Sequence, residues 1–206
     1  MSLVHYFYPL HELAFEVLNT DIPVVYTNES IAGPTQQRVF GMEPFIKVHG
    51  KMTFTITPVA RYSIQGLVTG KKSYNDRWDM LAPYDINLIW GFLAEGNFSG
   101  HITFSQPFRS MNYNYYGGPL TQMEVLTHMS NNHIIPADEK ILKQIKQIGK
   151  GDIVLLEGYL VNVDGKGTDG SWSRWRTSLS RSDKEKDACE ILYVEKVSLS
   201  QDREGN

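Results

Sequence analysis

The chain has almost no capacity for covalent cross-linking. Its 206 residues include a single cysteine, Cys189, so no disulfide can form within it. A chain of this length can bury one sizeable core, since domains commonly contain roughly 100 to 200 residues. We therefore expect one main domain held together by packing alone, and the cysteine content does not indicate a cellular compartment.

Long apolar runs and a strong net charge are also lacking. The longest apolar stretch, residues 86–94 (INLIWGFLA), is about half as long as a membrane-spanning helix, and the N-terminus has no basic region typical of a signal peptide. We therefore expect no transmembrane segment. The formal net charge of −3 gives no global positive field for nucleic acid or anionic lipid, so binding of either would have to be local.

Spacings typical of metal ligands are absent as well. His128 and His133 lack the i, i+4 pairing of a helical zinc site, and there is no CxxC motif. Residues 164–170 (DGKGTDG) resemble a calcium loop, but Lys166 and Thr168 stand where oxygen-rich ligands are expected. The sequence predicts no metal site and no cofactor.

Alternation of apolar and polar residues dominates from residue 44 onward, which is typical of strands with one buried face. Residues 52–57 (MTFTIT) alternate strictly after a predicted turn at His49-Gly50. Residues 153–163 (IVLLEGYLVNV) are apolar on both faces and predict a central strand. We expect the strands to share one core, with these members: Met52, Phe54, Ile56, Tyr62, Ile64, Ile153, Leu155, Leu160, Trp175, Leu179, Leu192 and Val194.

One clear helix is predicted over residues 138–148, with Gly149 as its C-terminal cap. Its apolar residues recur with the helical period and belong to the same predicted core; they are Ile141, Leu142, Ile145 and Ile148. Residues 130–137 (SNNHIIPA) are interpreted as the loop that leads into this helix, because Pro136 cannot extend a helix backward. Residues 120–129 are a candidate for a second, short helix.

The order of these elements predicts a mainly β (β+α) fold. We expect an antiparallel small β-barrel, OB-like, with the helix at 138–148 plugging one end. Residues 1–42 are interpreted as an N-terminal extension packed on the domain, residues 43–199 as the barrel domain, and residues 200–206 as a disordered tail.

Over about residues 58–197, the chain resembles an uncharacterised family of bacterial proteins. The stretches that carry the resemblance are LAPYDINLIWG (81–91), SNNHIIPA (130–137), GDIVLLEGYLV (151–161), TSLSRSD (177–183) and ACEILYVE (188–195). Members often begin with a hydrophobic membrane or export segment, so the resemblance implies a location in the cell envelope. It implies no activity and no catalytic residue.

The sequence contains the residue types that a thiol-based catalytic site requires. Cys189 could act as a nucleophile with His133 as its base and Asp85 or Asn132 as the group that orients the base. Cys189 also lies just before an apolar strand, where a buried structural cysteine is the commoner meaning. We expect His133 to be at least partly buried and to have a structural role.

The most unusual candidate for recognition is the segment QPFRSMNYNYYGGPL (106–120). Its Asn, Gly and Pro content predicts no regular element, and aromatic side chains with a polar tip are effective binding groups in loops. The candidate binding residues are Phe108, Arg109, Tyr113, Tyr115 and Tyr116. The alternative is that the segment folds back as a lid over one end of the barrel.

A second candidate surface contains arginine beside tryptophan. In WSRWRTSLSR (172–181), Arg174 and Arg176 project to one face of a predicted strand and Trp175 to the other. Arginine and an aromatic ring can bind phosphate and stack on bases. The alternation instead favours Trp175 as a core residue.

These observations favour a non-catalytic module that binds a ligand or a protein partner. The first alternative is a hydrolase or transferase that uses Cys189 and His133. The second is an OB-like domain that binds single-stranded nucleic acid through Arg174, Arg176 and a row of lysines. The residues do not identify the ligand.

Overall fold

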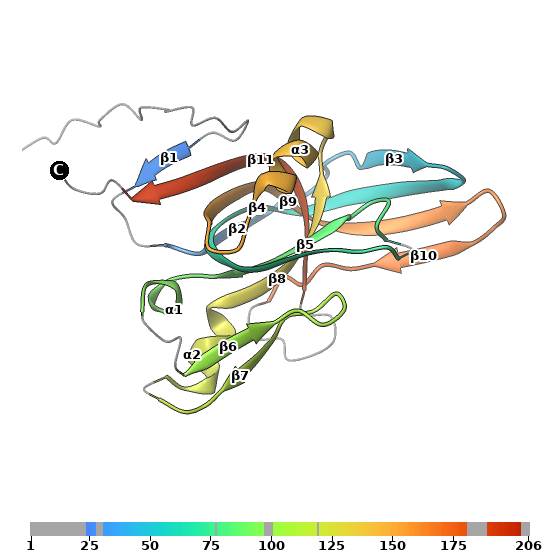
Figure 1. The fold of residues 1–206 in the computed structure, drawn as a ribbon. Helices are drawn as coiled ribbons and strands as arrows, with labels where there is room; N and C mark the ends of the chain where they lie inside the picture. Colours follow the sequence, from blue (N-terminus) through green and yellow to red (C-terminus); the bar gives the residue numbers. More distant parts are fainter. Residues whose placement is uncertain are drawn as a thin grey trace, which may run out of the picture.

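The structure is a computed structural model that describes residues 24–27, 31–76, 78–96, 101–118, 120–180 and 189–202. These residues form a mainly β fold (Figure 1), as predicted. The strands are β1 (Val24–Thr27), β2 (Pro34–Arg38), β3 (Phe45–His49), β4 (Met52–Ser73), β5 (Tyr84–Ile89), β6 (Ile102–Ser105), β7 (Asn112–Tyr115), β8 (Met129–Pro136), β9 (Ile153–Gly167), β10 (Trp172–Trp175) and β11 (Glu190–Asp202). The helices are α1 (Phe92–Glu95), α2 (Gln122–Thr127) and α3 (Glu139–Gln147).

The long strand β4 organises the main sheet. One of its edges pairs in turn with β3, β2 and β5, and the other pairs with β9 along most of its length. Five strands pair in a closed ring, in the order β4, β5, β8, β11, β9 and back to β4. All pairings in the ring are antiparallel except that of β8 with β11, which is parallel. The expectation of a wholly antiparallel sheet is therefore wrong.

The segments at the two ends of the chain join this sheet. Strand β1 pairs in parallel with β11, and β2 pairs with β4, so parts of the predicted N-terminal extension are strands of the main sheet. Strand β11 reaches Asp202, while residues 203–206 of the predicted tail and residues 1–23 lie outside the described residues. No helix among the described residues is long and apolar enough to cross a membrane.

The predicted helix is present as α3, and its N-terminus is capped. The side chain of Asp138 accepts a hydrogen bond from the backbone N–H of Ile141 at 2.8 Å. At the other end, the Lys71 ammonium group donates to the carbonyl oxygens of Ile145 and Ile148, at 2.8 and 2.6 Å. These bonds fix the C-terminus of the helix against β4. The short helix expected within residues 120–129 is also present, as α2.

The stretch SNNHIIPA is not a loop. Residues 129–136 form β8, which lies between β5 and β11 and is almost entirely buried. The prediction failed because polar residues that are usual in turns here bond to neighbouring strands; Asn132, for example, donates to the carbonyl oxygen of Ile86. Pro136 is tolerated because it is the last residue of the strand.

The expectation of a single core is wrong, because the sheet buries both of its faces. Inside the ring, Tyr62, Ile64 and Leu160 pack with Ile145 of α3. On the opposite face, other predicted core residues, including Phe54 and Ile56, pack with Trp78, Leu81 and Ala82 from the β4–β5 connection. The strands that are apolar on both sides, such as β9, supply both layers.

A third apolar cluster lies beneath a small hairpin. Strands β6 and β7 pair with each other in a two-stranded sheet on the opposite side of the main sheet from α3 (Figure 1). Ile102 of β6 packs there with Leu93 of α1 and Val125 of α2. Because β7 spans Asn112–Tyr115, the expectation that residues 106–120 contain no regular element is wrong.

Candidate functional site

Two of the candidate catalytic residues lie opposite each other in the antiparallel pairing of β5 with β8. These are Asp85 and His133, which are 0% and 3% exposed. Their neighbours Ile86 and Ile134 point into the ring, so Asp85 and His133 point to the outer face of the sheet. Pairing of the two strands therefore brings together residues that are far apart in the sequence.

Arg109 reaches this face from the connection between β6 and β7. Its Nη1 donates to Asp85 Oδ1 at 3.0 Å, while its Nε and Nη2 donate to the two carboxylate oxygens of Asp76 at 2.6 and 2.9 Å. The guanidinium also lies over the ring of Tyr74, 4.3 Å from its centroid. With a side chain only 14% exposed, Arg109 is a buried ionic bridge and not a free recognition group.

Amide side chains extend the network. Gln106 Nε2 donates to the side-chain oxygens of Asn87 and Asn131, at 3.2 and 3.4 Å. Asn131 Nδ2 donates to Asp85 Oδ2 at 3.4 Å and to the carbonyl oxygen of Arg109 at 3.2 Å. The segment from Gln106 to Arg109 is therefore fastened to the sheet by several partly buried bonds.

The charges in this network change the acidity of two neighbouring groups. The hydrogen bond from Arg109 is the main reason that the pKa of Asp76 lies below its ordinary value. Burial, followed by the negative charge of Asp85, raises the pKa of Tyr74 above its ordinary value. Tyr74 therefore stays protonated over the physiological range, and its hydroxyl donates to the carbonyl oxygen of Phe108.

His133 lies between Asp85 and the ring of Trp175. Its Nδ1 lies 2.9 Å from Asp85 Oδ1, but outside the direction of a ring N–H hydrogen bond. Its ring packs against Trp175, with centroids 4.5 Å apart. A general base has to reach a proton on the nucleophile or substrate. His133 is 3% exposed, and the carboxylate beside it also accepts a hydrogen bond from Arg109.

Cys189 belongs to the same region. Its Sγ lies 3.6 Å from Asn131 Nδ2 and 3.9 Å from the carbonyl oxygen of Arg109. The structure therefore brings Cys189, Asp85 and His133 into one neighbourhood, through Asn131 and Arg109. Cys189 is a half-buried free cysteine, and these two contacts are with an amide and a carbonyl group.

The aromatic residues of the segment 106–120 are divided between surface and interior. Phe108 is 86% exposed and has a φ of 51°, and Tyr116 is 67% exposed. Tyr113 and Tyr115 pack against the cluster beneath the hairpin. The hydroxyl of Tyr115 also accepts the backbone N–H of Leu120 at 3.0 Å. Phe108 and Tyr116 are therefore the exposed rings among the four, and Tyr113 and Tyr115 are packed against the cluster.

Arg174 and Arg176 are held by the same carboxylate. Arg174 Nε lies 3.4 Å and Arg176 Nη2 lies 2.7 Å from Asp164 Oδ1. The exposed ring beside them belongs to Trp172, 4.8 Å from the guanidinium carbon of Arg174, and not to Trp175. The alternation that placed Trp175 inside could also have placed Trp172 outside. One carboxylate therefore offsets part of the positive charge that the two arginines give this surface.

A candidate binding space lies elsewhere. A cavity of about 450 Å³ opens between the ends of β4 and β5, helix α1 and strand β6. Apolar side chains make up most of its lining, and the residues concerned are Leu67, Ile89, Leu93, Ala94, Ile102 and Phe104. Thr69, Thr103 and Lys150 supply polar atoms. Sequence reasoning missed this cavity, because its walls come from segments that no local pattern connects.

No family model, curated protein or solved structure matches this chain. Among the described residues, no group of three or more His, Cys, Asp and Glu side chains is placed to hold a metal ion. The function has to be argued from the site geometry alone.

Proposed function

We propose that the chain is a non-catalytic, OB-like binding module that holds a small, mainly apolar ligand in the cavity between α1 and β6. The observation that carries this proposal is the cavity, whose volume of about 450 Å³ is within the range typical of small-molecule sites, roughly 300 to 1,000 Å³.

The OB-like description is supported by the order of the strands. Taken along the chain, the five strands of the ring pair in the order first, second, third, fifth, fourth and back to first. The third and fifth strands are parallel, and α3 lies between the third and fourth. This arrangement supports the comparison with OB-like, partly open Greek-key barrels.

The lining of the cavity suggests the chemistry of its ligand. Leu93, Ile102 and Phe104 offer an apolar surface, which favours a hydrocarbon or aromatic body. Lys150 is exposed at the cavity and has no acidic partner among the described residues. A ligand with an apolar body and an acidic end group would satisfy both features.

The alternatives have less support. Asp85 and His133 form part of a network that fastens residues 106–109 to the sheet, and neither residue lines the apolar cavity. Arg174 and Arg176 share one carboxylate. A binding module therefore fits the geometry better than a thiol enzyme or a protein for single-stranded nucleic acid.

The proposal predicts that a side chain filling the cavity abolishes ligand binding. In calorimetric titrations with decanoate, an apolar acid, we expect saturable binding to the parent protein. Ala94→Phe should weaken it by at least about tenfold, or ~1.4 kcal/mol, because the added ring occupies ligand space. Thr53→Phe, an exposed change on β4 far from the cavity, should bind decanoate like the parent.

Circular dichroism spectra of both variants should match that of the parent, so that lost binding is not lost folding. The proposal is wrong if the parent shows no saturable heat, or if Ala94→Phe binds decanoate as tightly as Thr53→Phe does.

A further inference from the structure

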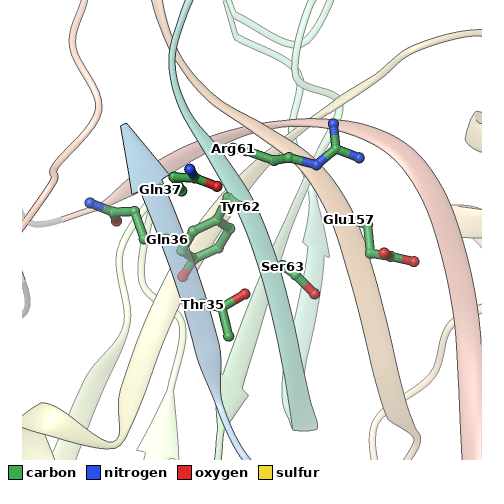
Figure 2. A pocket seen from close by; sticks show the side chains of 7 residues that line it. All are labelled: Thr35, Gln36, Gln37, Arg61, Tyr62, Ser63 and Glu157. Atoms are coloured by element: carbon green, nitrogen blue, oxygen red, sulfur yellow. The ribbon is translucent and has the colours of Figure 1, made fainter. Parts of the chain in front are cut away.

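A second hollow lies over β2, β4 and β9, and Figure 2 shows the side chains that line it. Its volume is about 210 Å³, and its lining is polar, unlike that of the apolar cavity. The side chains that matter for the argument are Thr35, Gln37, Arg61, Ser63 and Glu157.

Strand register places these side chains in two rows. Thr35 of β2 lies opposite Ser63 of β4, which in turn lies opposite Glu157 of β9. Two residues along, Gln37 lies opposite Arg61 in the same way. Residues two apart on a strand point to the same face, so the five polar groups form one surface.

The guanidinium of Arg61 is held in place but keeps spare donors. Its Nη1 donates to the hydroxyl of Tyr159 at 3.0 Å, and its carbon atom lies 5.5 Å from the centroid of that ring. An arginine has five N–H donors, and the others have no partner among the described residues. The side chain is therefore preorganised to donate to a ligand.

The other groups also have unused bonding capacity. Glu157 pairs with Lys196 through Oε2 at 2.8 Å, which leaves Oε1 available as an acceptor. The side chains of Thr35, Gln37 and Ser63 have no hydrogen-bond partner in the described part of the chain. The surface thus offers donors and acceptors within the same small hollow.

The mixed polar groups suit a ligand that has both donors and acceptors. Arg61 would repel a cation, and Glu157, which is paired with Lys196 through Oε2, keeps Oε1 as an acceptor for a hydroxyl group. A neutral molecule rich in hydroxyl groups can both donate to Glu157 and accept from Arg61. The only aromatic side chain of the lining, Tyr62, is 1% exposed and offers no stacking surface. Binding should therefore depend on hydrogen bonds and be weak.

We propose that this hollow is a binding site for an uncharged saccharide. The site is independent of the apolar cavity, since the two share no residue.

The test is an NMR titration of the full chain, with the side-chain amide signals of Gln36 and Gln37 as reporters. The probes are maltotriose, cellotriose and the trisaccharide of N-acetylglucosamine, with inorganic phosphate for comparison. We expect at least one trisaccharide to shift these signals saturably in the millimolar range, and phosphate to leave them unchanged. Arg61→Met should weaken that binding by at least about tenfold, whereas Gln147→Leu, an exposed change on α3, should not.

Ser63→Val gives a second variant that keeps strand propensity while removing one hydroxyl group. It should weaken the same binding without changing the backbone spectrum elsewhere. The proposal is overturned if none of the three saccharides gives a saturable shift, if phosphate competes with them, or if Arg61→Met binds like the parent.

Discussion

Arg109→Met should destabilise the protein by about 3–5 kcal/mol, the cost typical of removing one partner from a buried ion pair. The substitution leaves Asp85, which is fully buried, without its arginine partner. It also releases the link to Asp76 that holds the 106–109 segment against the sheet. The measurement is urea unfolding at neutral pH, with the free energy extrapolated to water.

Arg174→Met is the matched control. The side chain of Arg174 is 57% exposed and pairs with a half-exposed Asp164, so its removal should cost at most about 1 kcal/mol. Equal losses in the two variants would contradict the view that Arg109 is a structural bridge.

The ion pair between Arg109 and Asp76 predicts that stability depends on pH. Because Arg109 lowers the pKa of Asp76 in the folded state, the stabilisation is fully present above the unfolded-state pKa of an aspartate and is lost as the pH falls through the lower folded-state pKa. The parent should therefore lose stability in mild acid more steeply than Arg109→Met, in which Asp76 lacks the hydrogen bond that lowers its pKa most. Parallel curves for the two proteins between neutral pH and mild acid would contradict this assignment.

Ile145→Ala is expected to cost about 2–5 kcal/mol, because it leaves a cavity in a rigidly packed core. Ile145 is fully buried in the inner cluster, at the point where α3 packs on the ring of strands. Ile46→Ala, at a position that is 59% exposed on β3, should change the free energy of unfolding by about 0.5 kcal/mol or less. A loss for Ile145→Ala no larger than that of Ile46→Ala would mean that α3 contributes little to the core.

The features that the sequence predicted well are those encoded locally. The stripe that contains Ile141 and Ile145 identified α3, because helical spacing can be read within two turns. The alternation in residues 52–57 identified the start of β4 for the same reason. Predictions failed where contacts between segments distant in the sequence determine the structure. In β8, the polar residues Asn131 and His133 are buried because Arg109 and Asp85 come from other strands and connections.

The candidate site also depends on contacts between distant segments that local sequence patterns do not predict. Asp85 and His133 were predicted as candidate catalytic residues and Arg109 as a candidate binding residue, but their proximity depends on the pairing of β5 with β8 and on the path of the 106–111 connection. The exposed polar surface formed by Thr35, Arg61 and Glu157 depends on the register of three strands, which no pattern within one strand specifies.

The most direct test of the binding proposal is an isotope-filtered NOE experiment on the labelled protein with unlabelled decanoate. If the ligand occupies the cavity, its hydrocarbon chain should give NOEs to the methyl groups of Leu93 and Ile102. The methylene group next to its carboxylate should give NOEs to the side chain of Lys150. The account would be contradicted if NOEs appeared only to the exposed rings of Phe108 and Tyr116, or if no residue of the cavity gave an NOE.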